Sequence, residues 1–146
     1  MNQETNRNSS FFRFEDLRVY NKAIDFACDV AATCANNVMS TASNILISLS
    51  DSAKLIAVHI AECPSNDKQG FSDSLKAAKA EIRRCVVYIT LAAKAGGLSD
   101  TEEQEYRTQL MELTKMIGAL INSLYKSNNN GQQPAQQEDD LESLTW

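Results

Sequence analysis

His59 and Glu62 are the two residues whose types and spacing come closest to those of a catalytic pair. Residues three positions apart lie on the same face of a helix, and an imidazole beside a carboxylate can transfer protons. The same spacing is also typical of a partly exposed histidine with a local carboxylate partner, and His59 is the only histidine of the chain. The sequence contains no glycine-rich phosphate loop, no nucleophile elbow and no His-Glu-x-x-His zinc motif. We therefore predict that the protein is not an enzyme and has no catalytic residues.

Four cysteines are the other residues that could form a reactive or metal-binding site: Cys28, Cys34, Cys63 and Cys85. None of them belongs to a Cys-x-x-Cys pair, and three of them lie on or near apolar stripes. This distribution is typical of buried free thiols, and it predicts neither a metal nor another cofactor. Spacing alone leaves open a mixed cysteine and histidine site assembled from several helices.

A set of basic residues could bind phosphate groups. Four of them share one helical face: Lys76, Lys79, Arg83 and Lys94. Positive charges on one face can contact the phosphates of RNA or DNA. Asp73 and Glu81 lie nearby, however, and a basic stripe of this kind is also the pattern of an ordinary solvated helix face. Both interpretations remain open from the residues alone.

The segments that must position these residues have helical periodicity. Apolar residues recur at alternating steps of three and four over four ranges, about 15–36, 43–61, 67–95 and 100–126. The short links between these ranges favour antiparallel neighbours. The sequence therefore predicts an all-α protein, an antiparallel up-down-up-down four-helix bundle around one shared core.

Capping residues mark several ends of these predicted helices. Asp67 is a suitable N-cap for the third helix, and Gly96-Gly97 can supply the left-handed residue beyond its end. Ser99 and Glu102 have the spacing of a capping box, in which each side chain bonds to the backbone amide of the other residue. The fourth helix is therefore expected to begin directly after Ser99.

Each predicted helix has one apolar stripe that should face the core. The stripes are Leu17, Tyr20, Ile24, Ala27, Ala31 and Cys34 in the first helix; Leu46, Leu49, Ala53, Ile56 and Ile60 in the second; Phe71, Leu75, Ala78, Ile82, Cys85, Ile89 and Ala92 in the third; and Tyr106, Leu110, Leu113, Ile117, Leu120 and Leu124 in the fourth. The second helix has further apolar residues outside its stripe: Ile45, Ile47, Leu55 and Val58. A helix that is apolar on more than one side is usually buried on more than one side, so we expect it to lie centrally or to contact another subunit.

Composition and charge suit one nearly neutral domain followed by an acidic C-terminal segment. The chain has 146 residues, of which 43% are hydrophobic, which is enough for a single core. Residues 127–146 carry four acidic and no basic side chains, whereas the remainder has 14 basic and 15 acidic side chains. A domain so close to neutrality has no global basic field that would attract nucleic acid and no global acidic field that would exclude it.

We divide the chain into a flexible segment 1–13, the bundle 14–126 and a disordered acidic tail 127–146, whose composition cannot bury enough apolar surface to become ordered. Leu141, Leu144 and Trp146 leave a docking motif open as an alternative. Charges interrupt the apolar runs before the roughly 20 residues that a membrane helix needs, and residues 1–10 lack the apolar region of a signal peptide. We expect a cytoplasmic protein that does not bind membranes.

The segment Phe14–Ala23 reads Phe-Glu-Asp-Leu-Arg-Val-Tyr-Asn-Lys-Ala. It resembles the opening motif of the bacterial four-helix-bundle proteins encoded in intervening sequences of large-subunit ribosomal RNA genes, a family that includes the accessory protein of diversity-generating retroelements. Ile60–Glu62 and Leu91–Leu98 are similar to the family's sequences at the ends of its second and third helices. The resemblance extends over about residues 14–125.

The resemblance implies an antiparallel bundle that assembles into a ring-shaped homopentamer. For the retroelement branch it also implies binding of RNA or DNA and of a reverse transcriptase. Where the family tends to have a basic pair, this chain has Ser50-Asp51, which removes charge that nucleic acid would need. Val86 and Val87 stand at positions that are polar in the family, so a neighbouring subunit is expected to cover them.

These observations predict a non-enzymatic, oligomeric assembly or protein-interaction module without cofactors. The predicted oligomer interface consists of Ile45, Ile47, Leu55, Val58, Val86 and Val87. The alternative is a nucleic-acid-binding accessory protein that acts with a reverse transcriptase or on structured RNA. Its predicted binding residues are Lys76, Lys79, Arg83 and Lys94.

Overall fold

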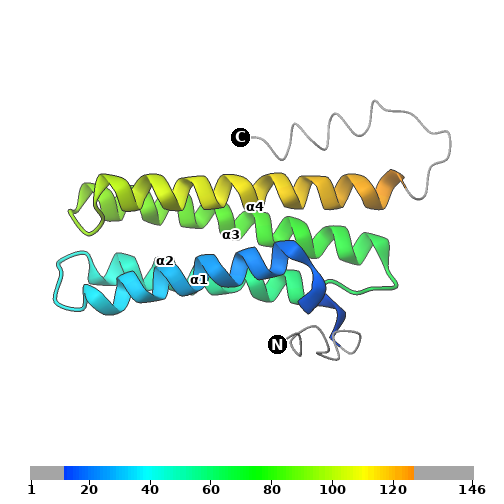
Figure 1. The fold of residues 1–146 in the computed structure, drawn as a ribbon, viewed down its shortest axis with the longest axis horizontal. Helices are drawn as coiled ribbons and strands as arrows, with labels where there is room; N and C mark the ends of the chain where they lie inside the picture. The colour runs from blue at the N-terminus through cyan, green and yellow to red at the C-terminus, as the bar shows by residue number, and fades with distance from the viewer. Residues whose placement is uncertain (1–11, 127–146) are drawn as a thin grey trace, which may run out of the picture.

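The computed structural model describes residues 12–126, and within this range the chain is helical with no β-strand (Figure 1). The elements are a short 3-10 helix, η2 (Arg13–Asp16), and four α-helices, α1 (Arg18–Asn36), α2 (Ser43–Ala61), α3 (Lys68–Lys94) and α4 (Asp100–Lys126). The predicted all-α class is confirmed, and the predicted bounds of α2 and α4 are the observed ones. The predicted tail 127–146, and most of the predicted N-terminal segment 1–13, lie outside the described residues.

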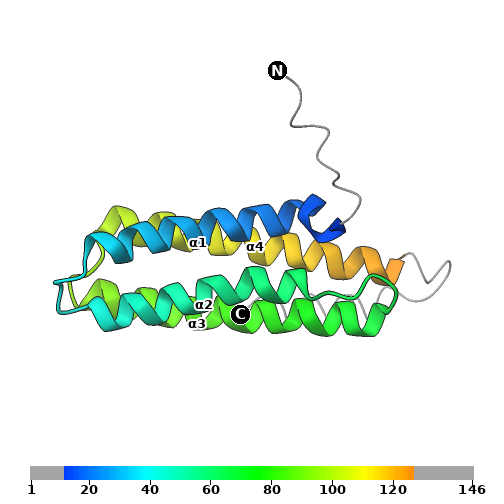
Figure 2. The ribbon, with the colours of Figure 1, turned by 90° about the horizontal axis from the view of Figure 1, so that it is seen from below.

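The four helices lie side by side around one core (Figures 1 and 2). Each helix contacts the next one along the chain, and α4 also contacts α1. Of these contacts, that between α2 and α3 is the most extensive and that between α1 and α4 the least. Loops 37–42 and 95–99 lie at one end of the molecule, which we call the closed end (Figure 1). The start of α1, loop 62–67 and the end of α4 lie at the opposite end, which we call the open end (Figure 1).

Apolar stripes on all four helices form the core. The predicted stripes of α2 and α3 are confirmed, since all their residues are fully buried except Phe71, which is half-buried. In α4 the predicted stripe is buried from Tyr106 to Ile117. Nearer the open end, Leu120 and Leu124 are only half-buried, and Ile121 occupies the core position instead.

The stripe predicted for α1 is wrong by one residue. The buried residues of α1 are Val19, Ala23, Phe26 and Val30. The predicted residues Tyr20, Ile24 and Ala27 are half-buried at the edge of the core, and Ala31 is exposed. α1 carries two neighbouring apolar stripes, and successive residues are about 100° apart around a helix. The placement of α2 and α4 on either side of α1 decides which stripe faces inward.

α1 also begins later than the predicted residue 15, because the chain bends before it becomes α-helical. Leu17 is extended (φ −71°, ψ 126°) between η2 and α1. The side-chain amide of Asn21 donates hydrogen bonds to the carbonyl oxygens of Glu15 at 3.0 Å and Leu17 at 3.1 Å. These bonds fix the direction in which the chain enters α1.

The end of α3 has the geometry that its two glycines predict. Gly96 has a φ of +79°, a conformation that a side chain disfavours. The amide of Gly96 donates to the carbonyl of Ala93 at 3.1 Å, and the amide of Gly97 donates to that of Ala92 at 2.8 Å. This pair of bonds is the Schellman arrangement, which satisfies carbonyl groups that the helix end leaves without partners.

Gly97 also allows the two loops of the closed end to touch. A Cβ atom added to Gly97 would lie only 2.5 Å from the Cβ of Ala42, which is fully buried in the other loop. Atoms at that distance overlap, so only glycine permits this approach. The glycine pair therefore both ends α3 and holds loops 37–42 and 95–99 together.

Side-chain caps begin α3 and α4 as predicted. Asp67 accepts a hydrogen bond from the amide of Gly70 at 3.1 Å. Ser99 accepts from the amide of Glu102 at 3.1 Å, and the Glu102 carboxylate accepts from the amide of Ser99 at 2.9 Å. The predicted capping box is therefore confirmed, and α4 begins directly after it.

Candidate functional site

Large apolar side chains are exposed on the outer faces of α2 and α3. α2 contributes Ile47, Leu55 and Val58, and α3 contributes Val87 and Leu91; each is between 40% and 56% exposed. We call these five residues the α2–α3 outer surface. α2 and α3 pack against each other more extensively than any other helix pair, so these residues lie on the solvent-facing sides of one helix pair.

The helical repeat explains why these side chains point outward. In α2 the buried stripe already faces α1 and α3, so apolar residues between its positions are directed away from the core. In α3, Val87 and Leu91 are one turn apart, and they lie away from the fully buried Cys85 and Ile89. Both helices are therefore apolar on a side that the fold of a single chain leaves in water.

The structure separates the six residues predicted as an oligomer interface into two groups. Ile47, Leu55, Val58 and Val87 are exposed. Ile45 and Val86 are instead half-buried and pack against the core of their own chain. Leu91 is exposed and was missed, although its position one turn after Val87 would have indicated it.

Charged side chains accompany these apolar ones. On α2, Lys54 Nζ lies 3.9 Å from Asp51 Oδ1, and both side chains are well exposed. On α3, Arg84 Nε lies 3.9 Å from Glu81 Oε1. Apolar side chains together with charges of both signs are typical of protein–protein contacts, in which a polar rim surrounds the buried centre.

The predicted pair of His59 and Glu62 is brought together by the structure. His59 Nδ1 lies 3.3 Å from Glu62 Oε1, one turn further along α2. The other ring nitrogen, Nε2, lies 3.9 Å from Glu81 Oε2 on α3. The imidazole therefore lies between two carboxylates and connects α2 to α3.

Glu81 is the unexpected member of this cluster, because sequence reasoning considered it only as a neighbour of the basic residues. Its side chain is 13% exposed, and its Oε1 atom is buried without a hydrogen bond among the described residues. Within residues 12–126, no three His, Cys, Asp or Glu side chains are arranged to hold a metal ion. The geometry of His59, Glu62 and Glu81 thus supports a contact between two helices.

The cysteines near this cluster are held as thiols. Burial raises the pKa of the Cys63 thiol to about 11, with a smaller contribution from the charge of Glu62. Burial likewise raises the pKa of Cys85 to about 12, with the Glu81 charge acting in the same direction. A nucleophilic cysteine needs the opposite shift, toward the thiolate.

The structure corrects one of the four predicted phosphate-binding residues. Lys76, Arg83 and Lys94 are exposed on α3, but Lys79 is only 5% exposed. Burial lowers the pKa of the Lys79 ammonium to about 8, and the charges of Arg83 and Lys76 lower it further. Lys79 directly follows the fully buried Ala78, so its side chain lies at the edge of the core. Lys79 is therefore a buried residue and does not belong to an exposed basic face.

α2 is also long and apolar enough to cross a membrane when judged by length and composition alone. Core helices of folded domains pass the same test. In this structure α2 contacts both α1 and α3, and eight of its residues are buried.

Within residues 12–126, the geometry thus defines an all-helical fold with exposed apolar residues on the outer sides of α2 and α3. Comparisons of the chain with protein-family models, with curated proteins and with solved structures find no match. The resemblance to the intervening-sequence family therefore stays a prediction.

Proposed function

We propose that the protein is a non-enzymatic assembly module, an antiparallel up-down-up-down bundle that binds through the α2–α3 outer surface. The observation that carries this proposal is the exposure of Ile47, Leu55, Val58, Val87 and Leu91. Full burial of such a side chain stabilises a contact by about 1.5–3 kcal/mol relative to exposure. A single chain leaves about half of this stabilisation unused, because each side chain is between 40% and 56% exposed, and an assembly gains that half.

A second copy of the same chain is the partner that we propose. α2 and α3 also carry the exposed charges of Asp51, Lys54 and Arg84, so two or more copies can pair opposite charges without a separate partner. The resemblance to the intervening-sequence family points in the same direction, since it implies a ring of five subunits. The ring size rests on that resemblance alone.

Two charges introduced into the surface test this proposal. Val87→Glu combined with Leu91→Glu would bury carboxylates in the contact, so the variant should sediment at the 16.2 kDa of one chain. The wild type should sediment at a multiple of that mass. Met111→Glu is the matched control, because Met111 is 54% exposed on α4 outside the surface. A wild type that sediments as one chain at high concentration, or a double variant that stays assembled, would exclude the proposal.

Nucleic-acid binding is the second candidate, favoured by the exposure of Lys76, Arg83 and Lys94 along α3. A fluorescence-anisotropy titration with structured RNA and single-stranded DNA, at about 50 and 200 mM salt, tests it. Binding should weaken steeply at the higher salt, and Lys76→Glu with Arg83→Glu should abolish it. Lys115→Glu, an exposed lysine on α4, is the control. Absence of binding at the lower salt would exclude this function.

A further inference from the structure

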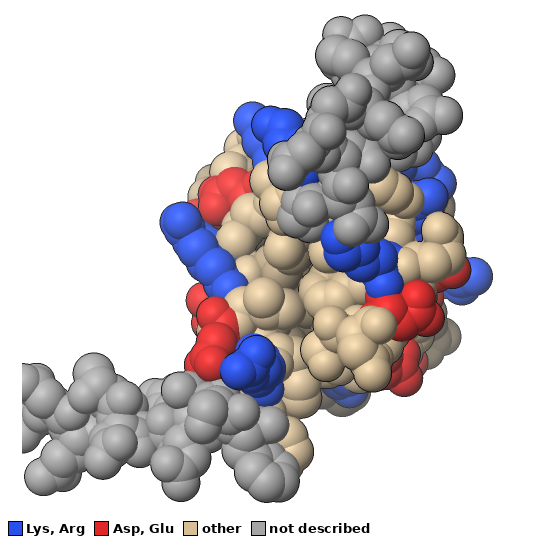
Figure 3. Space-filling view, turned by 90° about the vertical axis from the view of Figure 1, so that its right-hand side faces the viewer, with Lys and Arg blue, Asp and Glu red and all other residues tan. Residues whose placement is uncertain are grey.

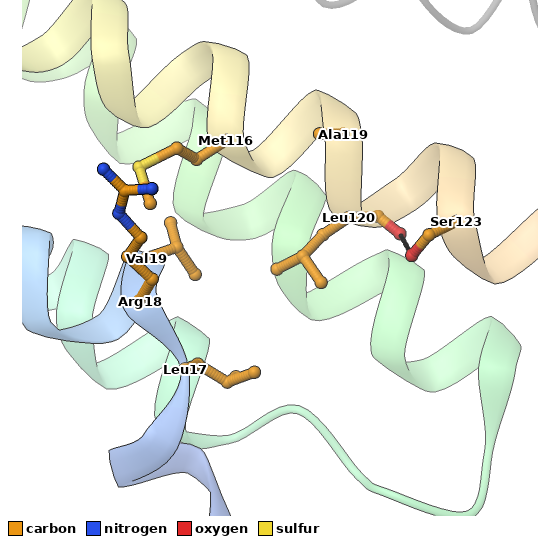
Figure 4. Close-up of a pocket in the computed structure, with 7 residues that line it drawn as sticks. All are labelled: Leu17, Arg18, Val19, Met116, Ala119, Leu120 and Ser123. Atoms are coloured by element: carbon orange, nitrogen blue, oxygen red, sulfur yellow. Dashed lines mark hydrogen bonds between the residues drawn. The ribbon is translucent and has the colours of Figure 1, made fainter.

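A groove opens between the start of α1 and the last turns of α4, the neighbouring helices with the least extensive contact (Figure 4). Its volume is about 300 Å³, enough to accept a large side chain. Leu17 and Val19 line it from the α1 side, and Met116, Ala119 and Leu120 line it from α4. Figure 4 shows the leucine, valine and methionine side chains directed into the space between the helices.

The walls of this groove are mainly apolar. Ser123 also lines it, but its hydroxyl group donates a hydrogen bond to the carbonyl of Leu120 at 3.0 Å and is therefore already satisfied. Arg18 is the charged residue of the lining. A ligand suited to this groove is thus apolar with an acidic group beside it.

The surroundings of the groove are positively charged. Figure 3 looks onto the open end, where Lys and Arg side chains lie around a largely uncharged centre, with Asp and Glu beside some of them. Segments 13–22 and 115–126, which contain the lining residues, hold five basic and two acidic side chains, and one of the basic residues, Lys22, pairs with Glu112 of α4 at 3.4 Å. The surroundings therefore favour an anionic partner.

The chain itself contains a segment with the complementary chemistry. Residues 138–146 read Glu-Asp-Asp-Leu-Glu-Ser-Leu-Thr-Trp, with four acidic side chains, three large apolar ones and no basic residue. We call this segment the C-terminal acidic motif. Leu141, Leu144 and Trp146 supply apolar side chains, and the acids lie among and before them.

The length of the intervening chain permits this contact. Residues 127–137 separate α4 from the motif, and a flexible chain of that length has an end-to-end distance of about 18 Å. The groove runs back along α4 from Ser123 to Met116, which is about 10 Å of helix. Such a short linker also gives the motif an effective concentration of the order of millimolar, so that weak contacts suffice.

We propose that the C-terminal acidic motif of the chain docks into the groove between α1 and α4. The apolar side chains of the motif fill the groove, and its carboxylates lie near Arg18. The contact joins the helix pair that the fold itself holds together least. It does not depend on the function proposed above, because the groove lies on α1 and α4 and not on the α2–α3 outer surface.

Trp146 makes this proposal directly measurable, because it is the only tryptophan of the chain. In the full-length protein at low salt, its emission should be blue-shifted, and acrylamide should quench it several-fold less than in the urea-unfolded chain. A tryptophan as accessible in the folded protein as in the unfolded one would refute the docking.

Ala119→Glu locates the binding site of the motif. It places a bulky negative charge in the groove wall, so it should restore quenching to the level of the unfolded chain. Ala80→Glu, at an exposed alanine of α3, should leave Trp146 protected. If Ala119→Glu disturbs the helices in circular dichroism, Arg18→Glu at the exposed Arg18 provides the second test, and it should increase quenching most at low salt. Protection that survives both groove variants would place the motif elsewhere and refute the proposal.

Dilution distinguishes the chain's own groove from that of another copy. Protection of Trp146 within one chain is independent of protein concentration. If quenching rises on dilution in step with a loss of sedimenting mass, the motif binds a second copy, which contradicts docking within the chain. The Val87→Glu and Leu91→Glu variant should keep Trp146 protected whether or not it is dissociated, so failure of one proposal is distinguishable from failure of the other.

Discussion

The two ends of the molecule are built differently. At the closed end, loops 37–42 and 95–99 touch, with Gly97 against Ala42 and the fully buried Leu46 beneath them. At the open end, α1 and α4 are joined by no loop, and a groove of about 300 Å³ separates them. The same four helices thus pack closely at one end and leave an apolar groove at the other.

The difference shows what loop connections contribute to packing. At the closed end, the Schellman turn at Gly96 fixes where α3 ends and the capping box at Ser99 fixes where α4 begins, so loop 95–99 has a defined course. At the open end, α1 begins without a side-chain cap, after an extended Leu17. Leu17, Met116 and Leu120 therefore remain half-buried at this end, where a further segment or partner can contact them.

The largest expected difference between the ends is in the cost of removing a leucine side chain. Leu46→Ala at the closed end should lower the free energy of unfolding by about 2–5 kcal/mol, because it leaves a cavity in a fully packed site. Leu120→Ala at the groove should cost less than about 2 kcal/mol, since this side chain is only half-buried. Urea denaturation of both variants measures the contrast. Equal losses would show that the two ends are packed equally well.

A smaller effect is expected from adding a side-chain atom at the point where the two loops touch. Gly97→Ala should lower the free energy of unfolding by about 1–3 kcal/mol, because its Cβ would overlap that of Ala42. Combining it with Ala42→Gly removes the overlapping atom and should restore part of the lost stability. Thermal denaturation of the single and double variants measures this rescue. A double variant no more stable than the sum of the two single changes would show that the contact is not the cause.

A third expected effect is a pH dependence of the free energy of unfolding, which comes from Lys79 in the half of α3 nearer the open end. Burial lowers the pKa of Lys79 from 10.5 to about 8. Between these values the unfolded chain keeps a proton that the folded chain has released, so the free energy of unfolding rises with pH. Lys79→Met should lack this rise, which urea denaturation at several pH values between about 8 and 10 would measure.

The Lys79→Met variant is needed for comparison because two thiols make the free energy of unfolding fall, not rise, with pH. Folding raises the pKa of Cys63 from 9.0 to about 11 and that of Cys85 from 9.0 to about 12. Above pH 9 the folded chain therefore holds protons that the unfolded chain releases, and stability falls. This contribution is common to both proteins and cancels in their difference. A difference that stays constant with pH would contradict the assigned role of Lys79.

The candidate surface was only partly predictable from the sequence. Ile47, Leu55 and Val58 lie off the buried stripe of α2, and a helical repeat is sufficient to place them outside. Ile45 lies off the same stripe, yet it packs against the core, because a neighbouring helix covers that side of α2. The contact of His59 with Glu81 joins two helices, so no spacing along the chain could have indicated it.

Interactions within a few residues were determined by the sequence itself. The capping box of Ser99 and Glu102, the N-cap at Asp67 and the glycine turn after α3 are local, and each was predicted from residue type and spacing. The buried stripes of α2 and α3 were also predictable, because in each helix apolar residues recur at alternating steps of three and four.

Only the tertiary structure decided the features that depend on a neighbouring helix. α1 has two adjacent apolar stripes, and the positions of α2 and α4 selected Val19, Ala23, Phe26 and Val30 for the core. Lys79 is a residue type that is usually exposed, but its position beside the core stripe of α3 buried it. The groove between α1 and α4 likewise depends on how two helices far apart in the sequence are placed beside each other. The physical reason is the same in each case: the periodicity of a helix fixes which residues share a face, and packing fixes which face is covered.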